Sequence, residues 1–225
     1  MIKKIDIAGL QLDNYTVREM MMKIDRCMSE RNFTTIEEIN MDTLHIAAAD
    51  EDVKQAIEVL DYTVIAETGI LSAASAETLQ RKHEIEDHDF FYELFKRLER
   101  NHRNVFVLGD SQPTVEEAAG FLKELFDKLE IKGSGVLDES ESTAEALVNE
   151  INIASPDVVV SFLPSPIQEV FLLHNKDKLS TNLWYGIGNN KFMDKKPGVI
   201  GKIRKMLDVK RLARIINNYE NQEEK

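Results

Sequence analysis

The sequence has almost no cysteine and no long apolar run. A single cysteine among 225 residues excludes an intramolecular disulfide and is compatible with a reducing compartment. No stretch approaches the roughly 18 apolar residues of a membrane-spanning helix, and residues 1–6 lack the apolar core of a signal peptide. We therefore predict a cytoplasmic protein without a membrane span.

Metal-ligand and phosphate-binding motifs are also missing. His83 and His88 are five residues apart with no cysteine nearby, which is not a zinc-site spacing, and the acidic residues around them are typical of a solvated surface. The chain contains neither a G-x-G-x-x-G motif nor a P-loop. Its net charge of −12 argues against general nucleic-acid binding. We predict no metal, no cofactor and no nucleic-acid partner.

Positive charge is concentrated near the C-terminus. Between residues 191 and 214, nine lysines and arginines are opposed by two aspartates, and apolar residues recur from residue 203 to 216 at helical spacing. This pattern is typical of a basic amphipathic helix, which binds an anionic membrane or docks on an acidic protein surface. We predict a domain over residues 1–195 and a basic helical appendage over residues 196–225.

Short apolar runs alternate with amphipathic segments along the first 188 residues. After a strand or hairpin near residues 3–12, strands are predicted at 33–39, 62–66, 104–109, 131–136, 158–163 and 183–188. Helices are predicted between them, at 16–30, 42–50, 52–60, 70–79, 89–98, 114–129 and 142–153. Such alternation indicates βαβ units. The fold class is therefore α/β, with a mainly parallel, Rossmann-like sheet flanked by helices.

The apolar strand at 158–163 ends in a turn between two prolines. Ser165 suits a helix N-cap, Pro166 the first helical position, and Gln168 the third position of a capping box. A strand, a tight turn and a helix N-terminus form the unit on which α/β proteins place anionic ligands. Other helix starts are predicted at Thr16, Asp42, Asp89 and Thr114.

Several motifs occur in a defined order along the chain: Asp6-x-x-Gly9, Asn40, Asp89, the strand Val105 to Gly109, Pro166-x-Gln168-Glu169, and Gly186-Ile187-Gly188 with Phe192 and Asp194. In this order they resemble the WecG/TagA/CpsF family of bacterial glycosyltransferases. The resemblance covers nearly the whole chain. It implies transfer of an N-acetylhexosamine, often N-acetylmannosamine, from a UDP-sugar to a polyprenyl-diphosphate-linked acceptor in cell-surface polysaccharide synthesis.

The chain departs from the family pattern at two charged positions. Ala66 stands where the family has its proposed catalytic Asp, so the neighbouring Glu67 is the remaining candidate base. Glu84 stands where the family has an Arg expected to meet the diphosphate. A transferase of this type must deprotonate an acceptor hydroxyl and neutralise the departing diphosphate. Alanine cannot take a proton, and a glutamate repels phosphate.

The resemblance also implies binding residues and partners. The predicted substrate- and nucleotide-binding set is Asn40, Thr68, Gly109, Gln168, Glu169, Gly188, Asn189 and Asn190. Gln168 and Glu169 fit a capped helix start equally well, and Gly109 fits close strand–helix packing. The basic tail resembles the family's appendage, which implies peripheral contact with the inner face of the plasma membrane. The family also implies a homo-oligomer.

Two functions fit this pattern. The first is a divergent hexosaminyltransferase in which Glu67, or a substrate-assisted route, replaces the lost Asp. The second is a catalytically silent relative that binds a nucleotide-sugar or a partner transferase. A third interpretation is an unrelated α/β module with a chance Gln-Glu match.

Overall fold

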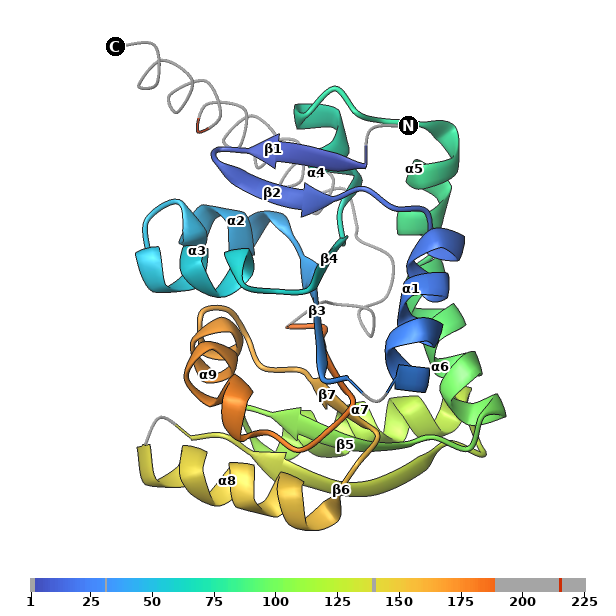
Figure 1. Ribbon diagram of the computed structural model, residues 1–225, viewed down its shortest axis with the longest axis vertical. Coiled ribbons are helices and arrows are strands. Elements are labelled where there is room, and N and C mark those ends of the chain that lie inside the picture. The colour runs from blue at the N-terminus through green and yellow to red at the C-terminus, as the bar shows by residue number, and fades with distance from the viewer. Residues whose placement is uncertain (1–2, 31, 139–140, 189–214, 216–225) are drawn as a thin grey trace.

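Six parallel strands form the centre of the protein in the computed structural model, which describes residues 3–30, 32–138, 141–188 and 215 (Figure 1). They lie in the order β4-β3-β8-β7-β5-β6, and every neighbouring pair is parallel. Their bounds are β3 (Thr34–Ile39), β4 (Tyr62–Ile65), β5 (Asn104–Gly109), β6 (Glu130–Val136), β7 (Val158–Ser161) and β8 (Leu183–Gly186). The predicted α/β fold is confirmed.

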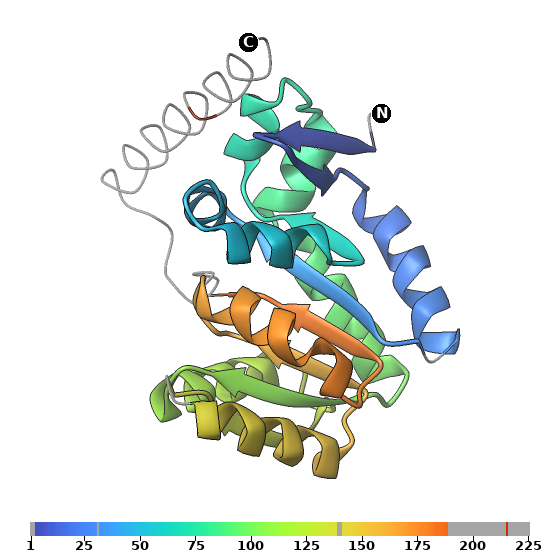
Figure 2. The same ribbon diagram turned by 60° about the vertical axis from the view of Figure 1, so that its left-hand side comes forward.

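Helices cover both faces of the sheet, with α1, α6 and α7 on one face and α3, α8 and α9 on the other (Figure 1, Figure 2). On β7, Val158 and Val160 pack into the core under the first group, and Val159 packs into the core under the second. Burial on both faces explains the unbroken apolar run of this strand. The helices are α1 (Val17–Glu30), α2 (Met41–Ala47), α3 (Glu51–Glu58), α4 (Thr68–Ala73), α5 (Leu79–Glu86), α6 (Asp89–Arg100), α7 (Gln112–Leu125), α8 (Glu141–Ala154) and α9 (Ile167–Asn175), and a 3-10 turn, η1 (Lys176–Lys178), follows α9.

An antiparallel hairpin, β1 (Lys4–Ile7) and β2 (Leu10–Asp13), lies beside the edge strand β4. Its turn residues Ala8 and Gly9 both have positive φ, at 52° and 85°, as a tight hairpin turn requires. Asp13 and Thr63 connect it to β4. The Asp13 N–H donates to Thr63 Oγ1 at 2.7 Å, and the Asp13 carboxylate accepts the Thr63 N–H at 3.0 Å. The predicted hairpin is confirmed.

The structure confirms one predicted helix cap and places three others on a different residue. The capping box at Thr16 is confirmed, because its N–H donates to the Glu19 carboxylate at 2.9 Å. Asn40 rather than Asp42 caps α2, accepting the Thr43 N–H at 2.8 Å. Ser111 rather than Thr114 caps α7, and Pro166 rather than Ser165 occupies the cap position of α9. A side-chain cap usually has extended backbone geometry, and Asn40 has it because it directly follows β3.

The segment predicted as one helix at 70–79 followed by a charged stretch contains two helices. The first, α4, ends at Ala73, and α5 begins after Thr78, whose hydroxyl accepts the Arg81 N–H at 3.2 Å. Arg81 and Ile85 are buried on α5. The charged composition concealed this helix because its buried stripe includes a cation.

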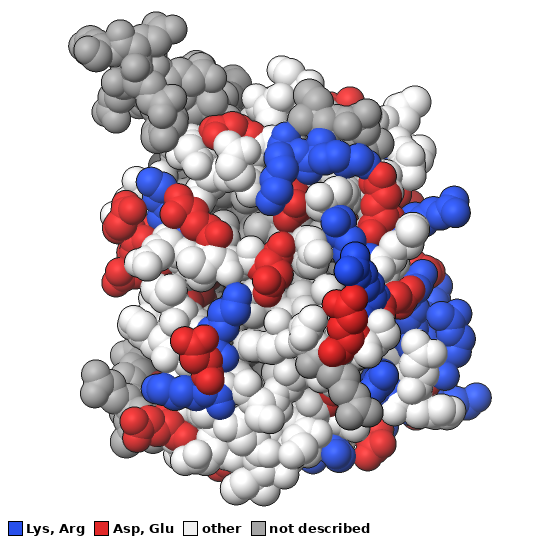
Figure 3. All heavy atoms as spheres, viewed as in Figure 1, with Lys and Arg blue, Asp and Glu red and all other residues white. Residues whose placement is uncertain are grey.

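No helix among the described residues is long and apolar enough to cross a membrane. The predicted appendage at 196–225 lies outside the described residues, except for Ile215. The boundary at residue 195 therefore stays a prediction. Figure 3 shows acidic and basic side chains interspersed over one face of the protein.

Candidate functional site

The site lies at the carboxyl edge of the sheet. Strands β5 and β7 are neighbours, but β5 leads into α7 on one face and β7 into α9 on the other (Figure 1). Open parallel sheets place ligands beyond the carboxyl ends of their strands at such a switch point. Six of the predicted residues follow strands at this edge: Asn40 after β3, Glu67 and Thr68 after β4, Gly109 at the end of β5, Gln168 after β7 and Gly188 after β8. Asn189 and Asn190 lie outside the described residues.

Gln168 connects α9 to the end of β8. Its side chain is buried, and its Oε1 accepts the Gly188 N–H at 3.2 Å. A Cβ placed on Gly186 would lie 2.6 Å from Gln168 Nε2 and 2.8 Å from Glu37 Cγ. Glycine is therefore required at position 186, because the side chains of Gln168 and Glu37 pass over it. The capping-box prediction for Gln168 is wrong, since its amide makes this tertiary contact instead.

Two buried acids beside Gln168 define what we call the Gln168 cluster: Glu37, Gln168, Glu169, Trp184, Gly186 and Gly188. Glu37, on β3, and Glu169, on α9, are 1% and 2% exposed. Trp184 Nε1 donates to Glu37 Oε1 at 3.0 Å. The Oε2 atom of each glutamate has no hydrogen-bond partner among the described residues. Sequence reasoning missed Glu37, although an acid inside a strand buried on both faces was the available signal.

Burial raises the pKa of both acids. For Glu37, desolvation raises the pKa well above its ordinary value and the nearby charge of Glu169 raises it further, while contacts with Trp184 and Gln168 oppose the shift. For Glu169, desolvation again raises the pKa, opposed by its own backbone N–H and by the Ser165 hydroxyl nearby. The pair therefore favours a protonated form.

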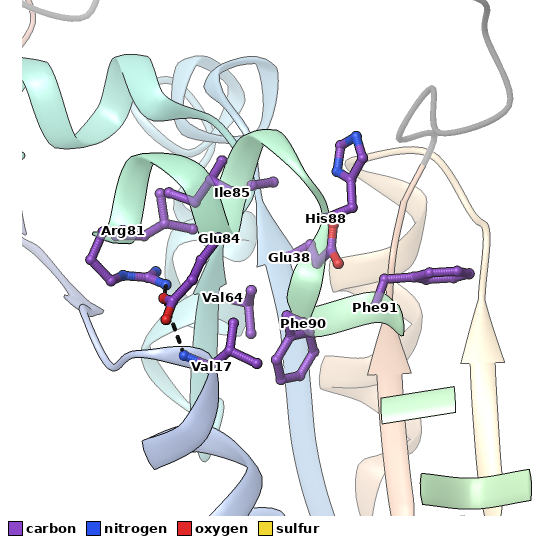
Figure 4. A pocket seen from close by; sticks show the side chains of 11 residues that line it. Val17, Glu38, Val64, Arg81, Glu84, Ile85, His88, Phe90 and Phe91 are labelled. Carbon is purple, nitrogen blue, oxygen red and sulfur yellow. Dashed lines mark hydrogen bonds and ion pairs between the residues drawn. The ribbon is translucent and has the colours of Figure 1, made fainter. Parts of the chain in front are cut away.

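A narrow cavity of about 20 Å³ lies on the opposite face of β3 (Figure 4). Glu38 lines it, and the Tyr185 hydroxyl donates to the Glu38 carboxylate. The ring of α6 residue Phe90 and the side chain of His88 lie on the same side as Glu38, while Arg81 and Glu84 lie across the cavity beside Val17 (Figure 4). Ala66 also lines this cavity.

A larger cavity, of about 260 Å³, lies at the amino end of β4 and away from this edge. It is bounded by the hairpin and the end of α3. The buried Asp13 at its wall already pairs with Lys4 at 3.0 Å and with the Thr63 N–H. The predicted site residues therefore lie away from this cavity, at the carboxyl edge of the sheet.

Comparison with known proteins identifies the family. The model of the "Glycosyl transferase WecG/TagA/CpsF family" matches residues 5–190. The chain belongs to this family. N-acetylglucosaminyldiphosphoundecaprenol N-acetyl-β-D-mannosaminyltransferases of Staphylococcus aureus strains NCTC 8325 / PS 47 and COL are 24% identical over 190 residues, which cover 83% of this chain and 74% of each relative. The enzyme of that name from strain MRSA252 is 23% identical over 190 residues. The predicted family is confirmed.

Glu84, which the resemblance places at the family's diphosphate-binding Arg, lies within what we call the Arg81 cluster: Asn14, Val17, Arg81 and Glu84. Arg81 Nη1 donates to Glu84 Oε2 at 2.7 Å, and Arg81 Nε donates to Asn14 Oδ1 at 3.1 Å. Glu84 Oε2 also accepts the Val17 N–H at 3.2 Å, at the start of α1. Sequence reasoning missed Arg81, which is 4% exposed and neutralises Glu84. The ion pair connects α5 to the β2–α1 junction.

Ala66, which the resemblance places at the family's Asp, donates its N–H to Ile39 O at 2.9 Å. The next residue, Glu67, is half-buried at the start of α4, and its Oε1 accepts the Met41 N–H at 3.4 Å. Its carboxylate therefore reaches across to the β3–α2 junction, next to Asn40. The structure brings the candidate base and Asn40 together at the sheet edge.

The remaining candidates have structural contacts of their own. The Asn40 amide oxygen accepts both the N–H and the hydroxyl of Thr43 as the cap of α2. A Cβ on Gly109 would lie 2.9 Å from Val115 Cγ2, so this glycine permits close strand–helix packing. His83 and His88 are exposed, as predicted. Among the described residues, no group of three or more His, Cys, Asp and Glu side chains could hold a metal ion.

Proposed function

We propose that the protein transfers an N-acetylhexosamine from a UDP-sugar to a polyprenyl-diphosphate-linked N-acetylglucosamine. The family and the names of the staphylococcal relatives support this class of reaction and this acceptor. The observation that carries the proposal is the arrangement of Asn40, Glu67, Gln168 and Gly188 at the carboxyl ends of neighbouring strands. Chemistry on a bound ligand at this edge is typical of α/β enzymes.

The donor would occupy the side formed by the Gln168 cluster. The Gln168 amide fixes Gly188, whose φ of +70° turns the chain at the end of β8. Asn189 and Asn190 follow directly and complete the proposed rim. A departing diphosphate requires positive charge, which we propose is supplied by the nine lysines and arginines of residues 191–214.

Glu67 would act as the general base. In the reaction, an acceptor hydroxyl oxygen bonds to the anomeric carbon of the donor sugar while the bond from that carbon to the UDP oxygen breaks. The hydroxyl proton moves to the Glu67 carboxylate, and UDP leaves with the bonding electron pair. General-base catalysis of this kind contributes about 10²–10⁴-fold in rate.

The experiment combines calorimetric titration with a transfer assay. We expect UDP and a UDP-N-acetylhexosamine to bind with micromolar affinity, and Glu67→Gln to lower the transfer rate by about 10²–10⁴-fold with donor affinity little changed. Glu38→Gln is the matched variant, because Glu38 lies on the adjacent strand. If Glu38→Gln loses activity while Glu67→Gln remains active, the general base is Glu38 on β3 and not Glu67.

A second candidate is a catalytically silent family member that binds a nucleotide-sugar or a partner transferase. Two observations favour it: Ala66 supplies no acid, and Arg81 is held by Asn14 and Glu84 instead of facing the sheet edge. Donor binding with no transfer by the wild-type protein, in the presence of a polyprenyl-linked acceptor, would support this alternative. Absence of UDP binding at millimolar concentration would contradict the transferase and the nucleotide-sugar-binding form alike.

The basic segment suits a peripheral location on the cytoplasmic face of the plasma membrane. Each lysine or arginine near an anionic surface contributes about 1 kcal/mol. We expect the full chain to sediment with vesicles containing anionic phospholipid at low salt, and a chain ending at residue 190 to remain in solution. Light scattering of the same samples tests the expected homo-oligomer.

A further inference from the structure

Two carboxyl groups with raised pKa values lie together behind the proposed donor site. Glu37 comes from β3 and Glu169 from the first turn of α9, and both are almost fully buried. One oxygen of each group has no hydrogen-bond partner among the described residues. The transfer chemistry proposed for Glu67 does not use either acid.

Among the described residues, no cation compensates the charges of Glu37 and Glu169. On α9 the neighbouring side chains are Glu169, which is acidic, and Gln168, which is neutral. On either side of Glu37 in the sheet, the register places Thr63 of β4 and Gly186 of β8, neither of which titrates. No Lys, Arg or His of the described residues contributes to the pKa shift of Glu37. Two buried like charges without a cation are unfavourable, so such a pair retains a proton.

Glu37 also contacts the residue that anchors the site. Its Oε1 accepts the Trp184 Nε1–H at 3.0 Å, which fixes the carboxyl group above the sheet. Its Cγ and the Gln168 amide lie side by side over Gly186. With its Nε2 end beside Glu37, the Gln168 amide has its Oε1 end toward the Gly188 N–H. A continuous set of contacts therefore runs from Trp184 through Glu37 and Gln168 to Gly188.

We propose that Glu37 is a positioning residue of the donor site: with Glu169 it retains one proton, and in that form it holds the Gln168 amide in the orientation that binds Gly188. The consequence for the donor rests on the proposed function, whereas the proton and the amide orientation do not. Loss of that proton would set two like charges against each other between β3 and α9, and their repulsion would displace α9, and with it Gln168, from Gly188. Donor affinity would then fall as pH rises.

Trp184 provides a direct measurement, because it is the single tryptophan of the sequence and it donates to Glu37. We expect its emission to change with pH in a transition above the ordinary glutamate range, and Glu37→Gln to abolish that transition. Glu169→Gln should move the transition to lower pH, since it removes the neighbouring charge. Glu38→Gln is the matched control: this acid is next in sequence but lies on the opposite face of β3, so the transition should persist.

Donor binding supplies the second readout. Glutamine resembles a protonated glutamate in shape, so Glu37→Gln should keep UDP affinity within about two-fold and make it independent of pH, whereas Glu37→Ala should weaken it about ten-fold or more. Thermal unfolding of each variant identifies loss of folding. Because Glu37→Gln is nearly isosteric, it keeps the test valid if Glu37→Ala does not fold.

The outcomes separate this proposal from the proposed function. The claim that the pair retains a proton would be wrong if the Trp184 emission changed in the ordinary pH range of a glutamate. It would also be wrong if the transition were unchanged in Glu37→Gln. Pronounced loss of UDP affinity in Glu37→Gln at neutral pH would show that the charged form is required, which contradicts the proposal. If UDP does not bind the wild type, the transferase proposal fails, and the fluorescence titration still decides the protonation of the pair.

Discussion

The Gln168 cluster and the Arg81 cluster both lie near the carboxyl edge of the sheet, but they differ in how closely they match the family pattern. The first keeps the Gln-Glu and Gly-Ile-Gly motifs, and its buried side chains contact one another across three elements. The second has an acid, Glu84, where the resemblance implies a diphosphate-binding Arg, and Glu84 forms an ion pair with Arg81 of the same helix. The Gln168 cluster therefore matches the family motifs, whereas the charges of the Arg81 cluster pair with each other.

The difference shows how a charge reversal can be accommodated in a buried place. Glu84 would be costly alone, because an unpaired buried charge is strongly unfavourable. Arg81, one helical turn earlier, neutralises it, and the Val17 N–H gives it a further partner. Position 84 can therefore hold an acid without loss of the fold, but Arg81 is bound to Glu84 and Asn14 and does not face a ligand.

Breaking the Arg81 cluster should have the largest effect on stability. Arg81→Ala leaves the carboxylate of Glu84 and the amide of Asn14 without their cationic partner, so we expect a loss of about 3–5 kcal/mol in the free energy of unfolding. Chemical denaturation measures it. Arg26→Ala, which removes an exposed ion pair with Glu30, is the control and should change stability by less than about 1 kcal/mol. Equal losses in both variants would mean that burial of the pair is unimportant.

Disturbing the Gln168 cluster should affect binding more than folding. In Gly186→Ala the new methyl group overlaps Gln168 and Glu37, and we expect a loss of about 1–3 kcal/mol in stability together with weaker UDP binding. Gly120→Ala in α7 is the matched control, since no atom lies within 4 Å of its added Cβ. It should stabilise the protein by about 0.5–1 kcal/mol. Unchanged UDP affinity in Gly186→Ala would separate this cluster from the donor site.

Asn40 directly follows β3 at the same sheet edge, and its replacement should have the smallest effect. Asn40→Ala removes the cap of α2, which we expect to cost about 1 kcal/mol. Asp42→Ala, the cap predicted from sequence, should cost less, because Asp42 is exposed in the first turn and caps nothing. Thermal unfolding compares the two. Weaker donor binding in Asn40→Ala beyond its effect on stability would assign Asn40 a role in the site as well.

Much of the fold was predictable because its signals are local. A run of β-branched residues predicts strand β7, and Thr16 with Glu19 forms a capping box within four residues. The helix α5 was missed because a charged residue, Arg81, occupies a buried position where an apolar residue is expected, so the sequence shows no clear apolar stripe. The caps at Asn40 and Ser111 were missed by a few residues, since several nearby polar side chains fit a cap equally well and the end of the preceding strand selects among them.

The sequence by itself determined the α/β alternation, the family and the positions of the edge residues, because period, turn residues and motif order are read along the chain. Only the tertiary structure decided the direction of Gln168, the pairing of Arg81 with Glu84 and the burial of Glu37 beside Glu169. Trp184 and Glu37 are 147 residues apart. Contacts between such distant residues leave no local pattern, and they exist only once the strands lie side by side.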